Sequence, residues 1–307
     1  MDILPLIKEN YPFEVKSKLS EGILETTQGR KKYRVWEDEK LLSWHQEWRD
    51  KCSKTPYQLT DRMLQTKDEK KAIKLENGWL TLHDELLDPY PTKDFEQDWA
   101  QFIARMIEFG DRKKEHSLST NKREFPQATD WKVWVSTTSL LDEKKRKILQ
   151  SCIQEAMRRK HKSLELTKKS NNQRLPLMDK ISSTNQAKKV FDLFVWQGTA
   201  EAPESGFISL TNFFQQWVGE NGEESLLKLL NEIDEQNQFR EKYGNDLLAE
   251  AWLPWELANA MELFLQCEEE EEIETHFSTF EKEWNERRQL VLALLNWLKE
   301  DRKKVAT

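Results

Sequence analysis

The sequence of 307 residues contains little cysteine, glycine or histidine, and each shortage excludes a class of function. The three cysteines, Cys52, Cys152 and Cys267, are odd in number and far apart, so they predict reduced thiols rather than a disulfide framework. None of the nine glycines builds a G-x-x-x-x-G-K-[ST] or G-x-G-x-x-G loop for phosphate. The five histidines lack H-x-x-x-H spacing, so no local metal site is predicted.

Long apolar runs are also absent. No stretch approaches the roughly 20 apolar residues that cross a bilayer, which excludes a membrane-spanning helix. The opening segment MDILPLIKENYPFEV lacks the basic and apolar regions of a signal peptide. We therefore expect a cytoplasmic protein that does not engage a membrane.

The charge balance argues against nucleic acid as a partner. The formal net charge is -7, which does not suit general binding to a polyanion. One basic stretch, KKRKILQSCIQEAMRRKHK, could bind phosphate or an acidic partner, but it lacks the interleaved aromatic residues of a base-stacking platform. We interpret it as the exposed face of a long helix.

Aromatic residues, in contrast, are abundant. Thirteen Trp and 14 Phe exclude a disordered chain, because such side chains need burial or a partner surface. Seven tryptophans are candidates for exposed anchors of a protein partner, and half-burial at a lobe surface is the competing interpretation. They are Trp36, Trp44, Trp48, Trp79, Trp131, Trp134 and Trp196.

The first ninety residues predict a small antiparallel sheet with one helix packed on it. Alternating and β-branched stretches indicate strands at 13–19, 22–29, 31–38, 62–66 and on both sides of an Asn77-Gly78 turn. An apolar face of period 3.6 predicts a helix over 38–52. His83 alternates with apolar strand residues, so we expect it to face solvent or a gap between lobes.

From residue 91 onward the pattern is mainly helical. Helices are predicted over 92–110, within 131–169 and through most of the last hundred residues, with an interruption at Pro254. The segment 185–198 could be strand or helix. These elements predict an α+β fold with a sheet lobe at 1–90 and a larger helical lobe at 91–307.

This element order resembles the choline and aminoglycoside kinase group, which shares the two-lobe protein-kinase-like fold. Within it, the sequence resembles the spore-coat-associated kinase-like proteins of the CotS/YutH type. Four segments carry the resemblance: LETTQGRKKYRVW, MLQTKDEKKAIKLENGWLTLHDEL, TDWKVWVSTTSLLDEKKRKI and SLTNFFQQWVGENGEESLLKLLNEIDEQ. The resemblance implies binding of ATP and magnesium by a basic residue, a catalytic Asp, an Asn five residues later and a further Asp on the next strand.

The residues at those places depart from the family pattern. Arg34 stands near the expected lysine, and Glu47 on the following helix could pair with it. If Asn185, at the end of the loop LPLMDKISSTN, is the metal-binding Asn, the proton acceptor is replaced by Lys180, and Asp179 is one residue out of register. A protonated lysine can neither accept that proton nor bind magnesium.

The acid of the next strand is also missing. Asp192 follows Asn185 too closely for a strand to fit between them, and FVWQG offers Trp196 and Gln197 where the acid is expected. We therefore expect a catalytically degenerate kinase that needs no cofactor, binds protein partners such as spore-coat proteins, and is deposited in the spore coat. One alternative is an active small-molecule kinase that uses ATP, Asp179 and Asp192. Another is a mainly helical regulatory or nucleic-acid-associated protein without the N-terminal sheet.

Overall fold

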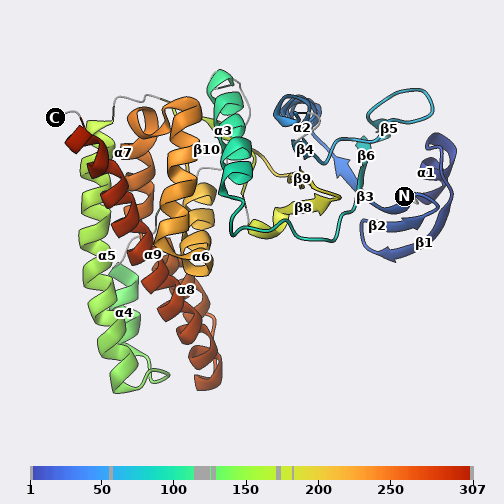
Figure 1. Ribbon diagram of the computed structural model, residues 1–307. Coiled ribbons are helices and arrows are strands. Elements are labelled where there is room, and N and C mark those ends of the chain that lie inside the picture. Colours follow the sequence, from blue (N-terminus) through green and yellow to red (C-terminus); the bar gives the residue numbers. More distant parts are fainter. Residues whose placement is uncertain are drawn as a thin grey trace. The chain divides into compact units, whose positions relative to one another are not determined.

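The computed structural model describes residues 3–54, 58–113, 125, 129–170, 174–181 and 183–304. The chain packs into two compact units, Met1–Asn121 with Pro176–Ser205, and Lys122–Leu175 with Gly206–Thr307 (Figure 1). The first unit therefore continues past residue 90 and takes in a second stretch of chain. The lobe boundary at residue 90 stays a prediction.

The first unit contains the predicted antiparallel sheet of five strands. Its order is β1-β2-β3-β6-β5, and every neighbouring pair is antiparallel. The strands are β1 (Val15–Ser20), β2 (Ile23–Thr26), β3 (Gly29–Trp36), β5 (Ile73–Leu75) and β6 (Gly78–Asp84). This sheet confirms the mixed α+β class and removes the ground for a mainly helical protein.

Two local predictions in this sheet need correction. Segment 62–66 forms no strand, since Leu64 makes one ladder-like bond to Leu82 and Thr66 closes a turn with Lys70. The hairpin turn lies one residue earlier than predicted, because Leu75 pairs with Gly78. Gly78 is a strand residue at φ 132°, and a Cβ there would lie 2.3 Å from the carbonyl oxygen of Trp36. Glycine is needed at this position for close backbone packing.

Two helices accompany the sheet, α1 (Leu4–Asn10) and α2 (Glu39–Cys52). The side chain of Asp38 caps α2 by accepting hydrogen bonds from the backbone N–H groups of Lys40 and Leu41. The inner face of α2 buries not only Trp44 and Trp48 but also the polar residues His45 and Arg49. This helix therefore brings the imidazole of His45 and the guanidinium of Arg49 into the interior.

The tryptophans proposed as exposed anchors are not exposed. Trp79 and Trp134 are half-buried. The other five have at most 4% of their surface exposed, namely Trp36, Trp44, Trp48, Trp131 and Trp196. Their rings fill the cores of both units, so tryptophan supplies no outward-facing anchor for a partner.

The undecided segment 185–198 is a β-hairpin. After the 3₁₀ turn Thr184–Gln186, strands β8 (Ala187–Val190) and β9 (Leu193–Trp196) pair antiparallel, and β4 (Gln58–Thr60) joins β9 in parallel. A second small sheet joins β7 (Leu177–Met178) to β10 (Glu204–Ser205). The helix α3 (Glu96–Arg112) packs Phe102 against Phe194 and Trp196 of the hairpin.

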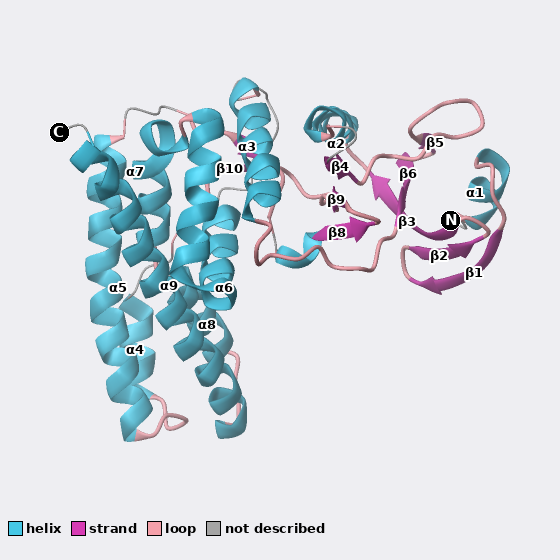
Figure 2. Ribbon diagram, in the orientation of Figure 1, coloured by secondary structure: helices cyan, strands magenta, loops and turns pink. Residues whose placement is uncertain are grey.

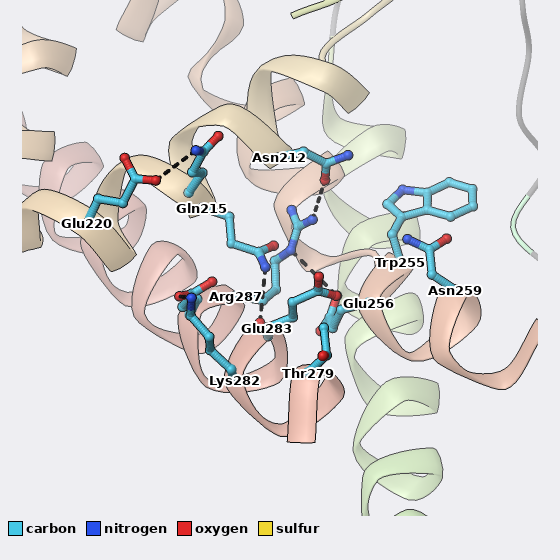
Figure 3. Close-up of a pocket in the computed structure, with 12 residues that line it drawn as sticks. Asn212, Gln215, Glu220, Trp255, Glu256, Asn259, Thr279, Lys282, Glu283 and Arg287 are labelled. Atoms are coloured by element: carbon cyan, nitrogen blue, oxygen red, sulfur yellow. Dashed lines mark hydrogen bonds and ion pairs between the residues drawn. The ribbon is translucent and has the colours of Figure 1, made fainter. Parts of the chain in front are cut away.

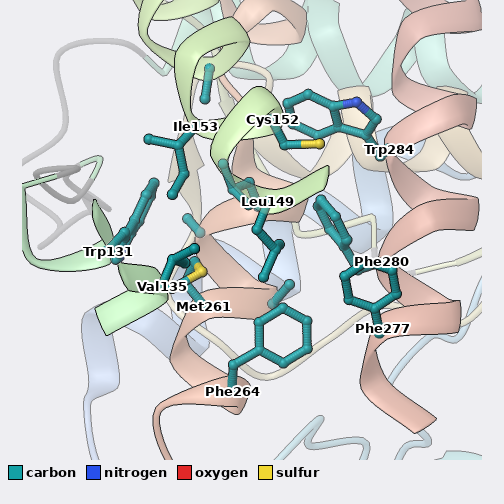
Figure 4. Packing of buried hydrophobic residues seen from close by; sticks show 14 of the residues in the cluster. Trp131, Val135, Leu149, Cys152, Ile153, Met261, Phe264, Phe277, Phe280 and Trp284 are labelled. Carbon is teal, nitrogen blue, oxygen red and sulfur yellow. The ribbon is translucent and has the colours of Figure 1, made fainter. Parts of the chain in front are cut away.

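The second unit is a helical bundle (Figure 2). Its helices are α4 (Thr129–Thr137), α5 (Glu143–Lys169), α6 (Ile208–Asn237), α7 (Phe239–Trp252), α8 (Trp255–Phe264) and α9 (Glu270–Lys304). Pro254 separates α7 from α8 as predicted. Residues of α4, α5, α8 and α9 form one apolar core, including Leu149, Met261 and Phe280 (Figure 4). None of the helices in the described part of the chain is long and apolar enough to cross a membrane.

Candidate functional site

The candidate site lies in the first unit and is centred on Arg34 of β3. The two terminal nitrogens of Arg34 donate to groups of its own chain. Nη1 lies 2.5 Å from the carbonyl oxygen of Thr199, and Nη2 lies 2.5 Å from that of Gly198 and 3.2 Å from Oδ2 of Asp61. Burial lowers the pKa of Arg34, and the charge of Asp61 opposes this shift. The predicted phosphate-pairing cation is thus bound to internal acceptors.

Asp61, directly after β4, is the shared counter-ion of two arginines. Its Oδ1 accepts from Nε of Arg49 at 2.9 Å and from the backbone N–H of Gly198 at 3.0 Å, while Oδ2 pairs with Arg34. Burial alone would raise the pKa of Asp61, but the charges of Arg49 and Arg34 and the hydrogen bond from the Gly198 N–H hold it below its usual value. Asp61 therefore carries a full negative charge in the interior.

Arg49 completes this cluster from the buried face of α2. Its side chain is 1% exposed, and its Nη2 donates to the carbonyl oxygen of Thr199 at 2.8 Å. Sequence analysis missed both Arg49 and Asp61. The available signal was the place of Arg49 one turn after His45 on the apolar face of α2, where a charge needs a buried partner.

Two neutral histidines line the same cluster. Nδ1 of His45 accepts from Arg49 at 2.8 Å, and its Nε2 donates to the carbonyl oxygen of Glu201 at 2.8 Å. Nδ1 of His83 donates to the carbonyl oxygen of Asp61, and its Nε2 accepts from the Thr81 hydroxyl. Burial lowers the pKa of His45 to about 4 and that of His83 to about 3. His83 is fully buried, which corrects the expectation that it faces solvent or a gap.

Asp179, immediately after β7, is the acid of the loop LPLMDKISSTN, and its side chain points inward. It is fully buried, and its two oxygens accept from the backbone N–H of Thr199 at 2.8 Å and from the Thr199 hydroxyl at 2.5 Å. A Cβ on Gly198 would lie 2.9 Å from Oδ2 of Asp179 and 2.7 Å from the ring of Trp48. Glycine at 198 therefore lets the segment after β9 close onto both Asp179 and α2.

The two neighbouring residues Asp179 and Lys180 point in opposite directions. Lys180 is exposed and pairs with Glu201 at 3.1 Å, while Asp179 occupies the inward position. Asn185 is exposed within the 3₁₀ turn. Among the described residues of this loop, Asp179 is the one whose charge acts on Arg34.

The remaining predicted residues lie elsewhere. Glu47 pairs with Lys113 at 2.7 Å rather than with Arg34, because Asp61 already neutralises Arg34. Asp192 lies in the turn between β8 and β9 with its side chain 99% exposed and pairs with Lys189. It does not face a cleft with Asp179, so the geometric condition for a shared metal is not met.

The described residues around Arg34 present few oxygen ligands for a magnesium ion. Magnesium at phosphate-transfer sites is usually held by one or two carboxylates together with substrate phosphates and water. Both oxygens of Asp179 already accept hydrogen bonds from Thr199, and Gln197, directly after β9, offers a neutral amide where an acid was expected. Within the described residues, no three His, Cys, Asp or Glu side chains gather as a potential metal site.

The sequence matches no model of a protein family and no curated protein. The structure is similar to several solved structures. An aminoglycoside phosphotransferase from Alicyclobacillus acidocaldarius superposes with a TM-score of 0.71 at 9% identity, over 98% of this chain and 97% of that chain. A spectinomycin phosphotransferase gives 0.55 at 10% identity over 96% and 97%, and an amicoumacin kinase 0.55 at 10% over 94% and 93%. The chain therefore has the two-lobe fold of the small-molecule kinases of the aminoglycoside phosphotransferase type.

Proposed function

We propose that this protein is a catalytically degenerate kinase that acts as an interaction or structural component. The observation that carries the proposal is the occupation of Arg34 by Asp61, Gly198 and Thr199. Hydrogen bonds to charged groups are worth about 1.5–3 kcal/mol each. A nucleotide phosphate would have to displace these internal acceptors before it could pair with Arg34, which strongly disfavours nucleotide binding.

The acids supply the second line of support. Phosphoryl transfer consists mainly of positioning and charge neutralisation, so both the proton-accepting carboxylate and the metal-binding carboxylate are needed for catalysis. Asp179 is committed to Thr199, and Gln197 carries no charge. The buried cluster around Asp61 then serves to hold the strand β3, the helix α2 and the segment after β9 together.

The biological setting of the proposal is the spore coat. It rests on the resemblance of segments 24–36, 63–86, 129–148 and 209–236 to spore-coat-associated kinase-like proteins. The protein would be made in the cytoplasm, bind other coat proteins and be deposited with them. Because the tryptophans are buried or half-buried, the contacts with such partners would use other side chains.

A nucleotide-binding experiment tests the loss of activity. The full chain is heated with ATP or ADP, with and without Mg²⁺, and the unfolding temperature is recorded beside that of Arg34→Met. We expect no magnesium-dependent shift and no phosphate transfer to amino-alcohols, aminoglycosides or sugars. A magnesium-dependent rise that Arg34→Met removes, or turnover of any of these acceptors, would show that the proposal is wrong.

A second candidate is an active small-molecule kinase. The inward position of Asp179 favours this candidate. The charge of Asp179 acts on Arg34 and partly opposes the lowering of the Arg34 pKa by burial. Similar structures include an aminopropanol kinase, with a TM-score of 0.52 at 10% identity. This candidate requires release of Asp179 from Thr199 when substrates bind. It predicts turnover that Asp179→Asn abolishes and that Asp192→Asn leaves intact.

A further inference from the structure

The second unit contains a pocket of about 420 Å³ between α6, α8 and α9 (Figure 3). This volume falls in the range of small-molecule sites in proteins. Exposed polar residues such as Asn212, Glu220 and Lys282 lie at its rim. Two charged side chains line its interior with 1–2% of their surface exposed, Glu256 and Arg287. Buried charges at a concave surface are unusual and call for a partner.

Arg287 is incompletely bound. Its Nη2 donates to Oδ1 of Asn212 at 2.6 Å. Its Nε lies 3.5 Å from Oε2 of Glu256, and neither Nε nor Nη1 makes a hydrogen bond. A buried donor without an acceptor costs about 1–3 kcal/mol, and more when it is charged. An oxygen from a ligand would satisfy this guanidinium.

The ion-pair geometry favours an oxygen ligand at Arg287. Glu256 is shared, because its Oε1 also accepts from Nη1 of Arg159 at 2.6 Å. The charges of Glu250 and Glu283 also act on Arg287, but among the described residues Glu256 alone lies within ion-pair distance of both guanidiniums, and its Oε2 makes no hydrogen bond. A carboxylate from a ligand would give Arg287 a hydrogen-bonded partner of its own.

A position that favours a cation, Glu283, lies one helical turn from Arg287. Glu283 precedes Arg287 by four residues on α9, so the two side chains share one face with Cβ atoms roughly 6 Å apart. Burial and the charges of Glu256 and Glu286 raise the pKa of Glu283, and the opposing charges of Arg287 and Lys282 do not cancel this shift. A cationic group beside Glu283 would relieve this repulsion.

We propose that this pocket binds an α-amino acid, with its carboxylate at Arg287 and its ammonium at Glu283. An α-amino acid carries both charges on one carbon, which matches the spacing of two side chains on neighbouring turns. A simple acid would leave Glu283 and Glu286 repelling each other, and a simple amine would leave Arg287 unsatisfied. The remaining volume, lined by polar groups such as the Gln215 amide, accommodates a polar side chain.

The test uses the full chain and the twenty standard L-amino acids as probes. Unfolding temperature identifies the strongest binder, and titration calorimetry measures its affinity. The same measurements follow with its carboxamide, which lacks the carboxylate, and its N-acetyl derivative, which lacks the ammonium. Since each group makes a charge-assisted contact, we expect each derivative to bind about tenfold more weakly or worse.

Matched variants locate the site. Glu283→Gln should weaken binding about tenfold or more. Glu281→Gln, an exposed residue of α9 outside this pocket, should leave the affinity unchanged. Arg287→Met should abolish binding. If that variant does not fold, the affinity of Glu283→Gln still tests whether this pocket is the binding site. Absence of saturable binding by any amino acid, a derivative that binds as tightly as its parent amino acid, or wild-type affinity in Glu283→Gln would overturn the proposal.

Discussion

Removal of the charge of Asp61 should destabilise the protein strongly. Asp61→Asn keeps the shape of the side chain but leaves Arg34 and Arg49 without their counter-ion. Both guanidiniums are largely buried, with 10% and 1% of the side chain exposed. Breaking a buried ion pair by removing one partner costs about 3–5 kcal/mol. We expect a loss in that range in the free energy of unfolding, measured by urea denaturation at neutral pH.

Asp192→Asn is the matched control for this substitution. It makes the same chemical change at a carboxylate that is 99% exposed, so the free energy of unfolding should change by less than about 0.5 kcal/mol. A loss below about 1 kcal/mol in Asp61→Asn would refute the reasoning, because it would mean that the two arginines find water or other acceptors. The difference between the two variants should fade in acid, where the lowered pKa of Asp61 is finally passed.

Three further predictions follow from buried or strained residues. The folded protein binds fewer protons at His45 and His83 than the unfolded chain, whose histidine pKa is about 6.5. The free energy of unfolding should therefore fall as the pH drops below about 6.5, by roughly 3 kcal/mol for His45 alone as its pKa of about 4 is passed. When it is measured by urea denaturation at several pH values, the free energy of unfolding of His45→Gln should depend less steeply on pH than that of the wild type. Gly78→Ala should cost about 2–4 kcal/mol in the same assay, because its Cβ meets the Trp36 oxygen, whereas Gly29→Ala, with open space at φ 84°, should cost only about 1–2 kcal/mol. Phe191→Asn should raise the unfolding temperature and add about 0.5–1 kcal/mol to the free energy of unfolding, because Phe191 is 89% exposed and lies at φ 54°, where Asn is better tolerated. An unchanged or lower unfolding temperature would contradict backbone strain at this residue.

Sequence periodicity predicted the sheet and the helices because each of them buries one face. The helix containing Trp99 and Met106 repeats at 3.6 residues, so local pattern and burial agree there. Strand β6 alternates in sequence, but it buries Thr81 and His83 as well as Leu80 and Leu82, because both of its faces are covered. The sequence does not decide between strand and helix at 187–196, because the stretch LFVW is apolar throughout and shows no alternation. Its short length and its neighbours in space determine its conformation.

The site could not be predicted in the same way. The partners of Asp61 come from β3, α2 and the segment after β9, and Gly198 lies 137 residues further along the chain. Nothing local distinguishes Asp61 from the other acidic residues, since its burial depends on tertiary packing. The count from Asn185 to Lys180 stays a prediction about catalytic roles. Spacing along a loop does not say which side chain turns inward, and the structure shows that Asp179, directly after β7, is the buried one.

The arginine of α2 explains why the cluster is self-contained. In active protein kinases the strand β3 supplies a lysine and the following helix supplies a glutamate, so the two neutralise each other and leave the lysine directed at phosphate. Here the helix supplies Arg49, a second cation, and the acid is Asp61 beside β4. One carboxylate now serves two guanidiniums, and the excess positive charge is satisfied by the carbonyl oxygens of Gly198 and Thr199. Arg49 and Arg34 thus bind the segment after β9 through its carbonyl groups, and under the proposed function the same carbonyl groups would occupy the position at Arg34 that a phosphate would need.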